Sequence, residues 1–336
     1  MLTRALYLLA FTPLLLTAQK VAVHVHDQDG SAVENASVKI TYEGITNLGK
    51  THEVEGITDE DGLFRSSGNA KVGLWFWVKK DGYYDHGYYP AERDIIGMNH
   101  LTDEIEKSIE LRQVINPIAL YGRFEGGGKI PLLGEWCGYD LAEGDWVAPH
   151  GDGEVADLML HFEREFIKFE ERRSPIEVRR EAIEGKYRRL GKEFTEEAFR
   201  LEAGLWNMSL EVAFPQEKEG LIRVSDAFNL HSVLRMPHQA PEEGYTPDYG
   251  YQIKSDQYLQ RRKDIGFFLR TRVVLDDYGE IESANYAKVH GDFRITVDGK
   301  VSFTYYFNPT PNDRNLEFER NLFPEGAPGT FNFVLP

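Results

Sequence analysis

Hydrophobic and polar residues alternate along several short stretches in the first third of the chain. Val21, Val23 and Val25 alternate with small or polar residues, which is the two-residue period of a half-buried strand. The pattern continues over residues 38–42, 64–66, 72–79 and 108–111. Gly30, Gly62 and Gly82 lie between such stretches, where hairpin turns need a positive φ. This spacing predicts an all-β sandwich over residues 20–114.

The remaining residues, 115–336, combine strand patterns with one helical stretch. Strands are predicted at 155–162 and 206–214, and two hairpins at 267–289 and 293–307. Between them, Ser174-Pro175 predicts a helix start with a serine cap, and Thr195 predicts a second cap. The tail after residue 312 has few strand signals. We predict a larger β-sandwich domain of unknown function with a helical insertion at about 174–204.

The first 19 residues have the pattern of a secretory signal peptide. Arg4 supplies the positive charge, and residues 5–16 form an apolar run. This run is shorter than the roughly 20 apolar residues that span a bilayer, and no later run is long enough. We expect a secreted, periplasmic or cell-surface protein whose mature chain has no membrane span. The alternative is an uncleaved N-terminal anchor.

The composition restricts the partners. The formal charge of −17 disfavours binding to phosphate backbones and to anionic lipid surfaces, so nucleic acid is not an expected partner. Cys137 is the only cysteine, so no intramolecular disulfide can form and the fold must rest on apolar burial. With 41% hydrophobic residues, the chain has enough apolar surface for two cores.

Several phrases near the N-terminus carry a family resemblance. They are Val23-His24-Val25-His26-Asp27-Gln28-Asp29-Gly30, then Ala36-Ser37-Val38, then Thr58-Asp59-Glu60-Asp61-Gly62-Leu63-Phe64, then Val78-Lys79-Lys80-Asp81-Gly82-Tyr83. In this order they resemble the carboxypeptidase regulatory-like domain, a transthyretin-like, seven-stranded sandwich related to bacterial immunoglobulin-like modules. The resemblance covers residues 20–114. It implies an exported accessory domain and no activity of its own.

The second region resembles exported bacterial proteins of unknown function. The phrases that carry this are Gly138-Tyr139-Asp140-Leu141 with Gly144-Asp145-Trp146-Val147-Ala148-Pro149, Asn285-Tyr286-Ala287-Lys288 with Gly291-Asp292-Phe293, and Asn308-Pro309-Thr310-Pro311-Asn312-Asp313-Arg314-Asn315-Leu316. This resemblance supports the two-domain order and leaves the chemistry open.

Acidic residues crowd one loop of the second region. The candidates for catalysis are Asp140, Asp145, Asp152, Glu154 and Asp157. A glycosidase needs two carboxylates roughly 5 to 10 Å apart across a cleft, and a calcium site with oxygen ligands needs a similar density of acidic residues. This loop is the place for either site. The alternative is an ordinary acidic surface, since 28% of the residues are charged.

Tyrosines cluster in turn-rich segments and are candidates for sugar contact. The ligand-binding candidates are Tyr83, Tyr84, Tyr88 and Tyr89, and a second cluster contains Tyr245, Tyr249 and Tyr251. Exposed planar rings stack on sugars while their polar tips tolerate water. Within the first cluster, we expect Tyr83 to pack against its own sandwich instead.

Three motifs contain the residue types of a metal site, but their spacing or setting argues against one. His52 and Glu55 have the spacing of a zinc carboxypeptidase pair, but residues i and i+3 of a strand point to opposite faces. His24 and His26 share a face, with His52 or His86 conceivable as a third zinc ligand, or they are simply half-exposed. The Asp-x-Asp-Gly phrases fail the calcium-loop register and fit turns. We expect no metal and no cofactor.

These observations favour a non-catalytic exported binding or structural protein of the bacterial cell envelope or exterior. Its expected partner is a carbohydrate or an envelope protein. The first alternative is a polysaccharide-active enzyme that uses the acidic loop. The second is a surface scaffold that binds other proteins through sandwich edges.

Overall fold

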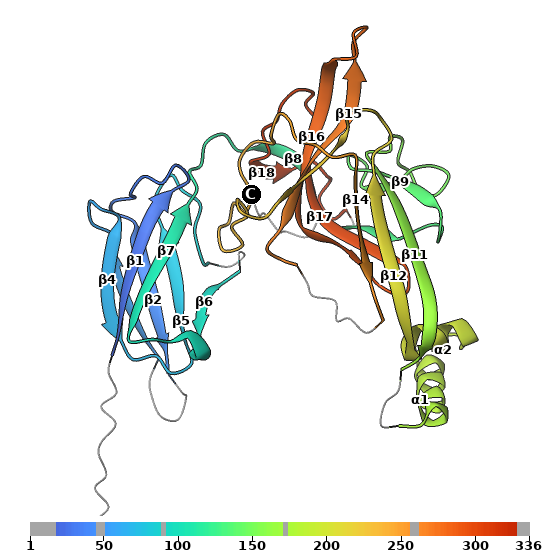
Figure 1. Cartoon of the computed structure of the whole chain (residues 1–336), viewed down its shortest axis with the longest axis horizontal. Helices are drawn as coiled ribbons and strands as arrows, with labels where there is room; N and C mark the ends of the chain where they lie inside the picture. The colour runs from blue at the N-terminus through green and yellow to red at the C-terminus, as the bar shows by residue number, and fades with distance from the viewer. Residues whose placement is uncertain (1–17, 45–50, 89–91, 171–173, 256–261, 328–336) are drawn as a thin grey trace, which may run out of the picture. The chain divides into compact units, whose positions relative to one another are not determined.

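A computed structural model describes residues 18–44, 51–88, 92–170, 174–255 and 262–327. The chain forms two compact units, one comprising residues up to Val114 together with His231–Val233, the other comprising the rest. The predicted mainly β fold class is confirmed (Figure 1). Most of the predicted signal peptide, residues 1–17, lies outside the described residues, as does Tyr89.

The first unit is a sandwich of two small sheets. Its strands are β1 (Gln19–Asp27), β2 (Ser37–Glu43), β3 (His52–Ile57), β4 (Leu63–Gly68), β5 (Gly73–Lys79), β6 (Asp94–Gly97) and β7 (Glu104–Leu111), with a 3₁₀ turn at Met98–His100. One sheet has the order β4-β1-β7 and the other β3-β2-β5-β6. All pairs are antiparallel except β1 with β7. The sandwich leaves one face of each sheet directed away from the core.

Alternation along the strands builds the core of this unit. Val21, Val23 and Val25 are at most 2% exposed, as the two-residue period predicts. The facing sheet contributes side chains of β2 and β5, namely Val38, Ile40, Tyr42, Leu74, Phe76 and Val78, each fully buried. The residues between these positions must therefore point away from the core, which decides what the outer face of β5 presents.

The two Asp-x-Asp-Gly phrases close turns with the same geometry. Asp27 Oδ1 accepts backbone N–H groups two and four residues ahead, at 3.0 and 2.9 Å. Asp59 Oδ1 repeats the arrangement at 3.1 and 2.9 Å. Gly30 and Gly62 take φ values of 82° and 70°, which favour glycine. Backbone hydrogen bonds thus account for both aspartates, as the turn interpretation expects.

The second unit is a larger sandwich. Its strands are β8 (Ile118–Lys129), β9 (Trp136–Asp140), β10 (Asp145–Trp146), β11 (Leu158–Phe169), β12 (Gly204–Ala213), β13 (Gly220–Val224), β14 (Asp248–Ile253), β15 (Gly266–Leu275), β16 (Ile281–Ile295), β17 (Lys300–Asn308) and β18 (Phe318–Asn321). The sheet orders are β10-β9-β11-β12-β14 and β13-β15-β16-β17-β8-β18. Buried side chains from both sheets share one core, including Tyr139, Phe162, Phe267, Phe303 and Tyr305. The two predicted hairpins are confirmed as β15–β16 and β16–β17.

Two helices, α1 (Ile176–Arg189) and α2 (Glu196–Ala203), form the predicted insertion between β11 and β12. The Thr195 hydroxyl accepts the Ala198 N–H at 3.1 Å, so the predicted cap is confirmed. The predicted Ser174 cap is wrong, because Pro175 itself occupies the N-cap position of α1 and no side chain caps it. Phe199 is 2% exposed and packs 5.0 Å from the Phe169 ring.

Strand boundaries in the second unit differ from the expected ones. The strand expected at 155–162 begins at Leu158 and continues to Phe169 as a ribbon paired with β12. The tail expected to be poor in strands forms β18, which pairs with β8 in parallel. Among the described residues no helix is long and apolar enough to cross a membrane.

Candidate functional site

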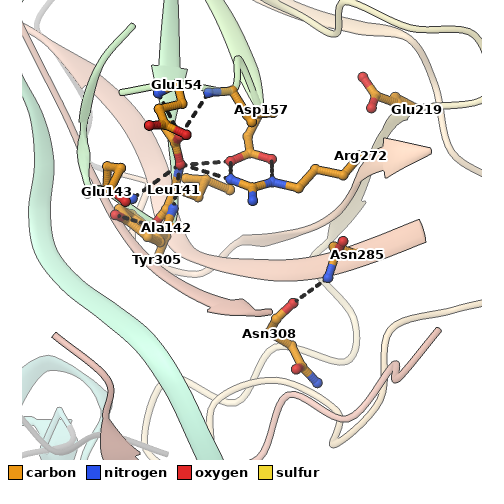
Figure 2. A network of polar contacts seen from close by, with 12 residues as sticks. Leu141, Ala142, Glu143, Glu154, Asp157, Glu219, Arg272, Asn285, Tyr305 and Asn308 are labelled. Carbon is orange, nitrogen blue, oxygen red and sulfur yellow. Dashed lines mark hydrogen bonds and ion pairs between the residues drawn. The ribbon is translucent and has the colours of Figure 1, made fainter. Parts of the chain in front are cut away.

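Two of the five acidic candidates are buried together in the second unit, at the end of β9 and just before β11. Asp140 is 2% exposed and Asp157 is fully buried. Arg272 of β15 binds both: its Nε and Nη2 lie 2.9 Å from the two Asp157 oxygens, and Nη2 lies 2.9 Å from Asp140 Oδ1. Figure 2 shows the guanidinium facing Asp157 edge to edge. This paired geometry is the strong form of a charge-assisted hydrogen bond.

Backbone N–H groups also donate to these two carboxylates. Asp140 Oδ1 accepts the amides of residues 142 and 143, and its Oδ2 accepts those of residues 154 and 155, at 2.9 to 3.2 Å. Asp157 Oδ2 accepts the Leu141 amide at 2.8 Å. The two side chains therefore hold the acidic loop to β9 and β15, and their geometry supports a stabilising role.

The other three acidic candidates lie at the surface of the same loop. Asp145 is half-buried, and its Oδ1 and Oδ2 accept the Trp146 and Asp152 amides at 2.8 and 3.0 Å. Asp152 and Glu154 are exposed. Of the five carboxylates named in the sequence, only these two are open to a substrate, so the catalytic alternative depends on them.

Glu219, just before β13, was not singled out from the sequence. It is 3% exposed, and its oxygens accept the Val273 and Gln216 amides, each at 3.1 Å. Burial raises the pKa of Glu219, and the charge of nearby Asp157 adds to this. A buried carboxyl with a raised pKa has the electrostatics of a general acid, but the Glu219 oxygens already accept hydrogen bonds from backbone amides. No sequence pattern marks it.

The tyrosine candidates fall into different environments. Tyr83 packs against the core of the first unit, as expected, with its hydroxyl 3.2 Å from Gln113 Nε2. Tyr84 is half-buried and its amide donates to the Arg112 carbonyl. Tyr88 is 42% exposed, and its ring meets Trp77 edge-on at 5.4 Å. Of the described tyrosines in this cluster, Tyr88 is the one presented to solvent beside another aromatic ring.

The second tyrosine cluster serves the core of the second unit. Tyr249 and Tyr251 pack against the main cluster of buried side chains. Their hydroxyls donate to Asp292 Oδ1 at 2.9 Å and to the Phe293 carbonyl at 2.6 Å. Burial raises the pKa of both phenols well above the ordinary range. Their polar tips are satisfied internally, so these rings are poor candidates for a sugar surface.

The outer face of β5 carries aromatic residues that sequence reasoning did not single out. Trp75 and Trp77 are half-exposed between the buried residues of β5. Together with Tyr88 they form what we call the aromatic face, on the β3-β2-β5-β6 sheet. The signal was in the sequence, since the inward alternation of residues 74, 76 and 78 places residues 75 and 77 outward.

Each ring of the aromatic face carries a cation. Arg93 lies over Trp75 at 4.5 Å, Lys39 over Trp77 at 4.8 Å, and Lys79 over Tyr88 at 4.5 Å. Lys39 and Lys79 also form ion pairs, with Glu53 at 2.7 Å and with Asp85 at 2.9 Å. The side-chain hydrogen bond to Glu53 raises the pKa of Lys39. These pairs order the rings without burying them.

The indole N–H groups of Trp75 and Trp77 differ in their hydrogen bonding. Trp75 Nε1 donates to Glu43 Oε2 at 2.9 Å. Trp77 Nε1 is shielded from solvent and has no hydrogen-bond acceptor within the described part of the chain. An indole N–H normally finds a partner, and the Trp77 N–H is an exception among the described residues.

The motifs that suggested metal chemistry separate in space. His52 stacks on Tyr42 with ring centroids 4.9 Å apart, whereas Glu55 lies 3.5 Å from Lys39 on the outer face, as the opposite-face argument expects. His24 pairs with Glu106 at 2.7 Å and His26 with Ser108 at 3.0 Å. Within the described ranges no group of three or more His, Cys, Asp or Glu could hold a metal ion.

Cys137 lies in the core of the second unit. Its side chain is 2% exposed, and burial raises the pKa of the thiol. Since the thiolate is the nucleophilic form, this environment makes Cys137 inert.

Comparison with known proteins identifies no family. No protein-family model matches the chain, and no curated protein matches it. Similar solved structures include a 3-chlorocatechol 1,2-dioxygenase from Rhodococcus opacus 1CP (12% identity, TM-score 0.22), the shaft pilin SpaA from Lactobacillus rhamnosus GG (11%, 0.21) and a streptococcal ancillary pilin (12%, 0.22). They cover 29%, 39% and 41% of this chain, which spans 60%, 62% and 45% of theirs. At such low scores these likenesses carry no argument about activity.

Proposed function

We propose that this protein is a non-catalytic exported binding or structural protein, and that the aromatic face is its ligand surface. The observation that carries the proposal is the presentation of Trp75, Trp77 and Tyr88 side by side on one sheet face of the first unit. Three partly exposed rings therefore lie together on one face of a small sheet. Such a surface is typical of ligand contact.

The proposed ligand is a carbohydrate. Sugar rings offer C–H faces that pack on planar aromatics and hydroxyls that exchange hydrogen bonds with charged neighbours. The aromatic face supplies both, since Lys39, Lys79 and Arg93 border the rings.

Several features support a binding role over a catalytic one. Asp140 and Asp157, the buried pair of the acidic loop, are held by Arg272 and by backbone amides. Carboxylates that are buried in such contacts are not accessible to a substrate proton. The regulatory-like resemblance of residues 20–114 agrees with an accessory module, and export remains part of the proposal through the signal-peptide pattern.

The test is binding of the chain without its signal peptide (residues 20–336) to a glycan array, with and without calcium, with the same spots assayed for released sugar. Retention without release is the expected result. Loss of the Trp77 contact should weaken binding by about 1 kcal/mol, roughly five-fold in Kd. Trp75→Ala and Trp77→Ala are therefore the test variants, and Tyr278→Ala is the matched control because Tyr278 is a 92% exposed ring in the second unit.

Other outcomes would redirect the assignment. If Trp75→Ala and Trp77→Ala bind as tightly as Tyr278→Ala, the aromatic face is not the ligand surface. Sugar release would establish an enzyme, and Asp152→Asn with Glu154→Gln would then test the acidic loop without disturbing the Arg272 contacts. Silence on every spot would leave the protein-binding scaffold as the better assignment.

A further inference from the structure

A buried histidine in the first unit lies at the centre of an ionic cluster that the proposed function does not use. His86 is 4% exposed, and its Nε2 lies 2.9 Å from Asp94 Oδ2. Lys107 Nζ approaches the same carboxylate at 2.8 and 2.7 Å, to Oδ1 and Oδ2 respectively. Asp94 is 3% exposed, so one buried carboxylate receives contacts from two basic side chains.

The backbone of His86 joins two segments of the unit. Its amide and carbonyl pair with those of Val78, at the end of β5, at 2.9 and 3.0 Å. On its other side it bridges Ser232: the Gly87 amide donates to the His231 carbonyl at 2.8 Å, and the Val233 amide to the Asp85 carbonyl at 3.0 Å. The turn at Asp85–Gly87 thus holds the segment His231–Val233 by two backbone hydrogen bonds.

We propose that His86, Asp94 and Lys107 form a pH-sensitive clasp, which holds the segment His231–Val233 against the turn at Asp85–Gly87 at neutral pH and releases it in mild acid. This inference goes beyond the proposed function and stands whether or not the aromatic face binds sugar.

The hydrogen bonds of the imidazole favour a neutral ring in the closed clasp. A neutral ring that faces a carboxylate carries its proton on Nε2 and donates it to Asp94. Nδ1 is then a bare acceptor, and it is buried with no partner within the described residues. Protonation would convert Nδ1 into a buried donor with no acceptor, which costs far more than an idle lone pair. The closed clasp therefore selects neutral His86.

The charges around His86 reinforce this selection. Asp94 of β6 attracts a proton to the ring, while Lys107 of β7 and His231 oppose it. The His231 ring centroid lies 5.7 Å from that of His86, and its Nε2 lies 3.9 Å from Asp94 Oδ1. Asp85 is engaged by Lys79 at 2.9 Å. Burial, the largest influence, lowers the pKa of His86, so the open state takes up a proton that the closed state refuses.

Linkage gives the size and the pH window of the effect. When opening is coupled to the uptake of one proton, the equilibrium constant for opening rises about tenfold for each pH unit below the ordinary histidine pKa near 6.5. The increase stops once the pH falls below the lowered pKa of His86 in the closed state. Release should therefore begin just below neutrality and level off in more acidic solution.

The experiment is hydrogen-exchange mass spectrometry on the full chain between pH 7.5 and pH 5, with each rate divided by the intrinsic rate at that pH. Peptides that cover residues 84–88 and 231–235 report the clasp, and a peptide within β2 reports global unfolding. Protection of the clasp peptides should fall about tenfold per pH unit over part of this range, while β2 keeps its protection.

Variants assign the proton. His86→Gln keeps a donor for Asp94 and cannot titrate, so its protection should not change with pH. His24→Gln, which alters an exposed histidine of β1, should keep the wild-type profile. A wild-type profile in His86→Gln would overturn the proposal, and so would a flat profile in wild-type protein. If His86→Gln does not fold, NMR titration of histidine ring carbons in the wild type decides: His86 must titrate together with the loss of protection.

Discussion

Arg272 should be the most costly single polar side chain to remove from the second unit. Arg272→Met keeps the length and apolar body of the side chain and deletes the guanidinium. Asp157 is fully buried and would lose both of its contacts to Arg272, and Asp140, 2% exposed, would lose one. Removing one partner of a buried ion pair costs about 3 to 5 kcal/mol, because the remaining charge stays desolvated.

The structure places the effect in that range. Asp140 keeps four backbone N–H partners, which compensate much of its charge, whereas Asp157 keeps the Leu141 amide. The loss at Asp157 therefore dominates. For a domain of about 200 residues, 1 kcal/mol corresponds to roughly 2 to 4 °C in Tm, so a decrease of about 6 to 20 °C is expected.

Scanning calorimetry of the full chain measures this change, with hydrogen exchange used to assign the transition to the second unit. Asp145→Asn is the matched control: its amide oxygen can still accept the Trp146 N–H, and a change below about 1 kcal/mol is expected. A Tm decrease of less than about 2 °C for Arg272→Met would refute the view that Arg272 holds the acidic loop together.

Three further predictions concern single positions. The pKa of Asp94 is lowered to about 2, since its hydrogen bonds to His86 and Lys107 outweigh the effect of burial. The free energy of unfolding of the first unit should therefore fall by about 2 kcal/mol between about pH 4 and about pH 2. Urea titrations measure this loss, which should be absent in Asp94→Asn. Gly126→Ala should cost about 1 to 3 kcal/mol in thermal unfolding, because a Cβ there would lie 2.8 Å from the Tyr305 ring; an unchanged Tm would contradict this. Thr195→Ala should remove about 1 kcal/mol with its cap, whereas Gly185→Ala, which meets only an arginine tip at 3.9 Å, should raise stability by up to about 1 kcal/mol; equal effects would speak against the helix assignments.

Strands with regular alternation could be predicted from sequence, and strands with unusual composition could not. β8 contains Gly126, Gly127 and Gly128, a residue type that is depleted in strands, and no strand was predicted over these residues. Glycine is required at Gly127, since a Cβ there would lie 2.6 Å from the Val301 carbonyl and φ is 94°. β18 is only four residues long, and it pairs with β8, which lies near the opposite end of the second unit in sequence. Neither local composition nor periodicity carries that information.

The candidate site shows the same division. The acidic loop was visible as a cluster of carboxylates, but Arg272 lies more than a hundred residues away from it. Nothing near Arg272 marks it as their partner. The aromatic face could have been derived from the alternation of β5, because the burial of Leu74, Phe76 and Val78 requires Trp75 and Trp77 to point outward. The candidates taken from the sequence were the tyrosines of the first cluster. Of its described members, only Tyr88 lies beside these tryptophans.

The sequence by itself determined the mainly β class, the turns at Asp27 and Asp59 and the inward valines of β1, because these follow from local periodicity and from hydrogen bonds within a few residues. Only the tertiary structure decided what the charged groups do. Burial and contacts between residues far apart in sequence determine whether a carboxylate is exposed, as at Asp152, or buried in an ion pair, as at Asp157. Those two quantities depend on how distant strands pair and pack, which no local pattern encodes.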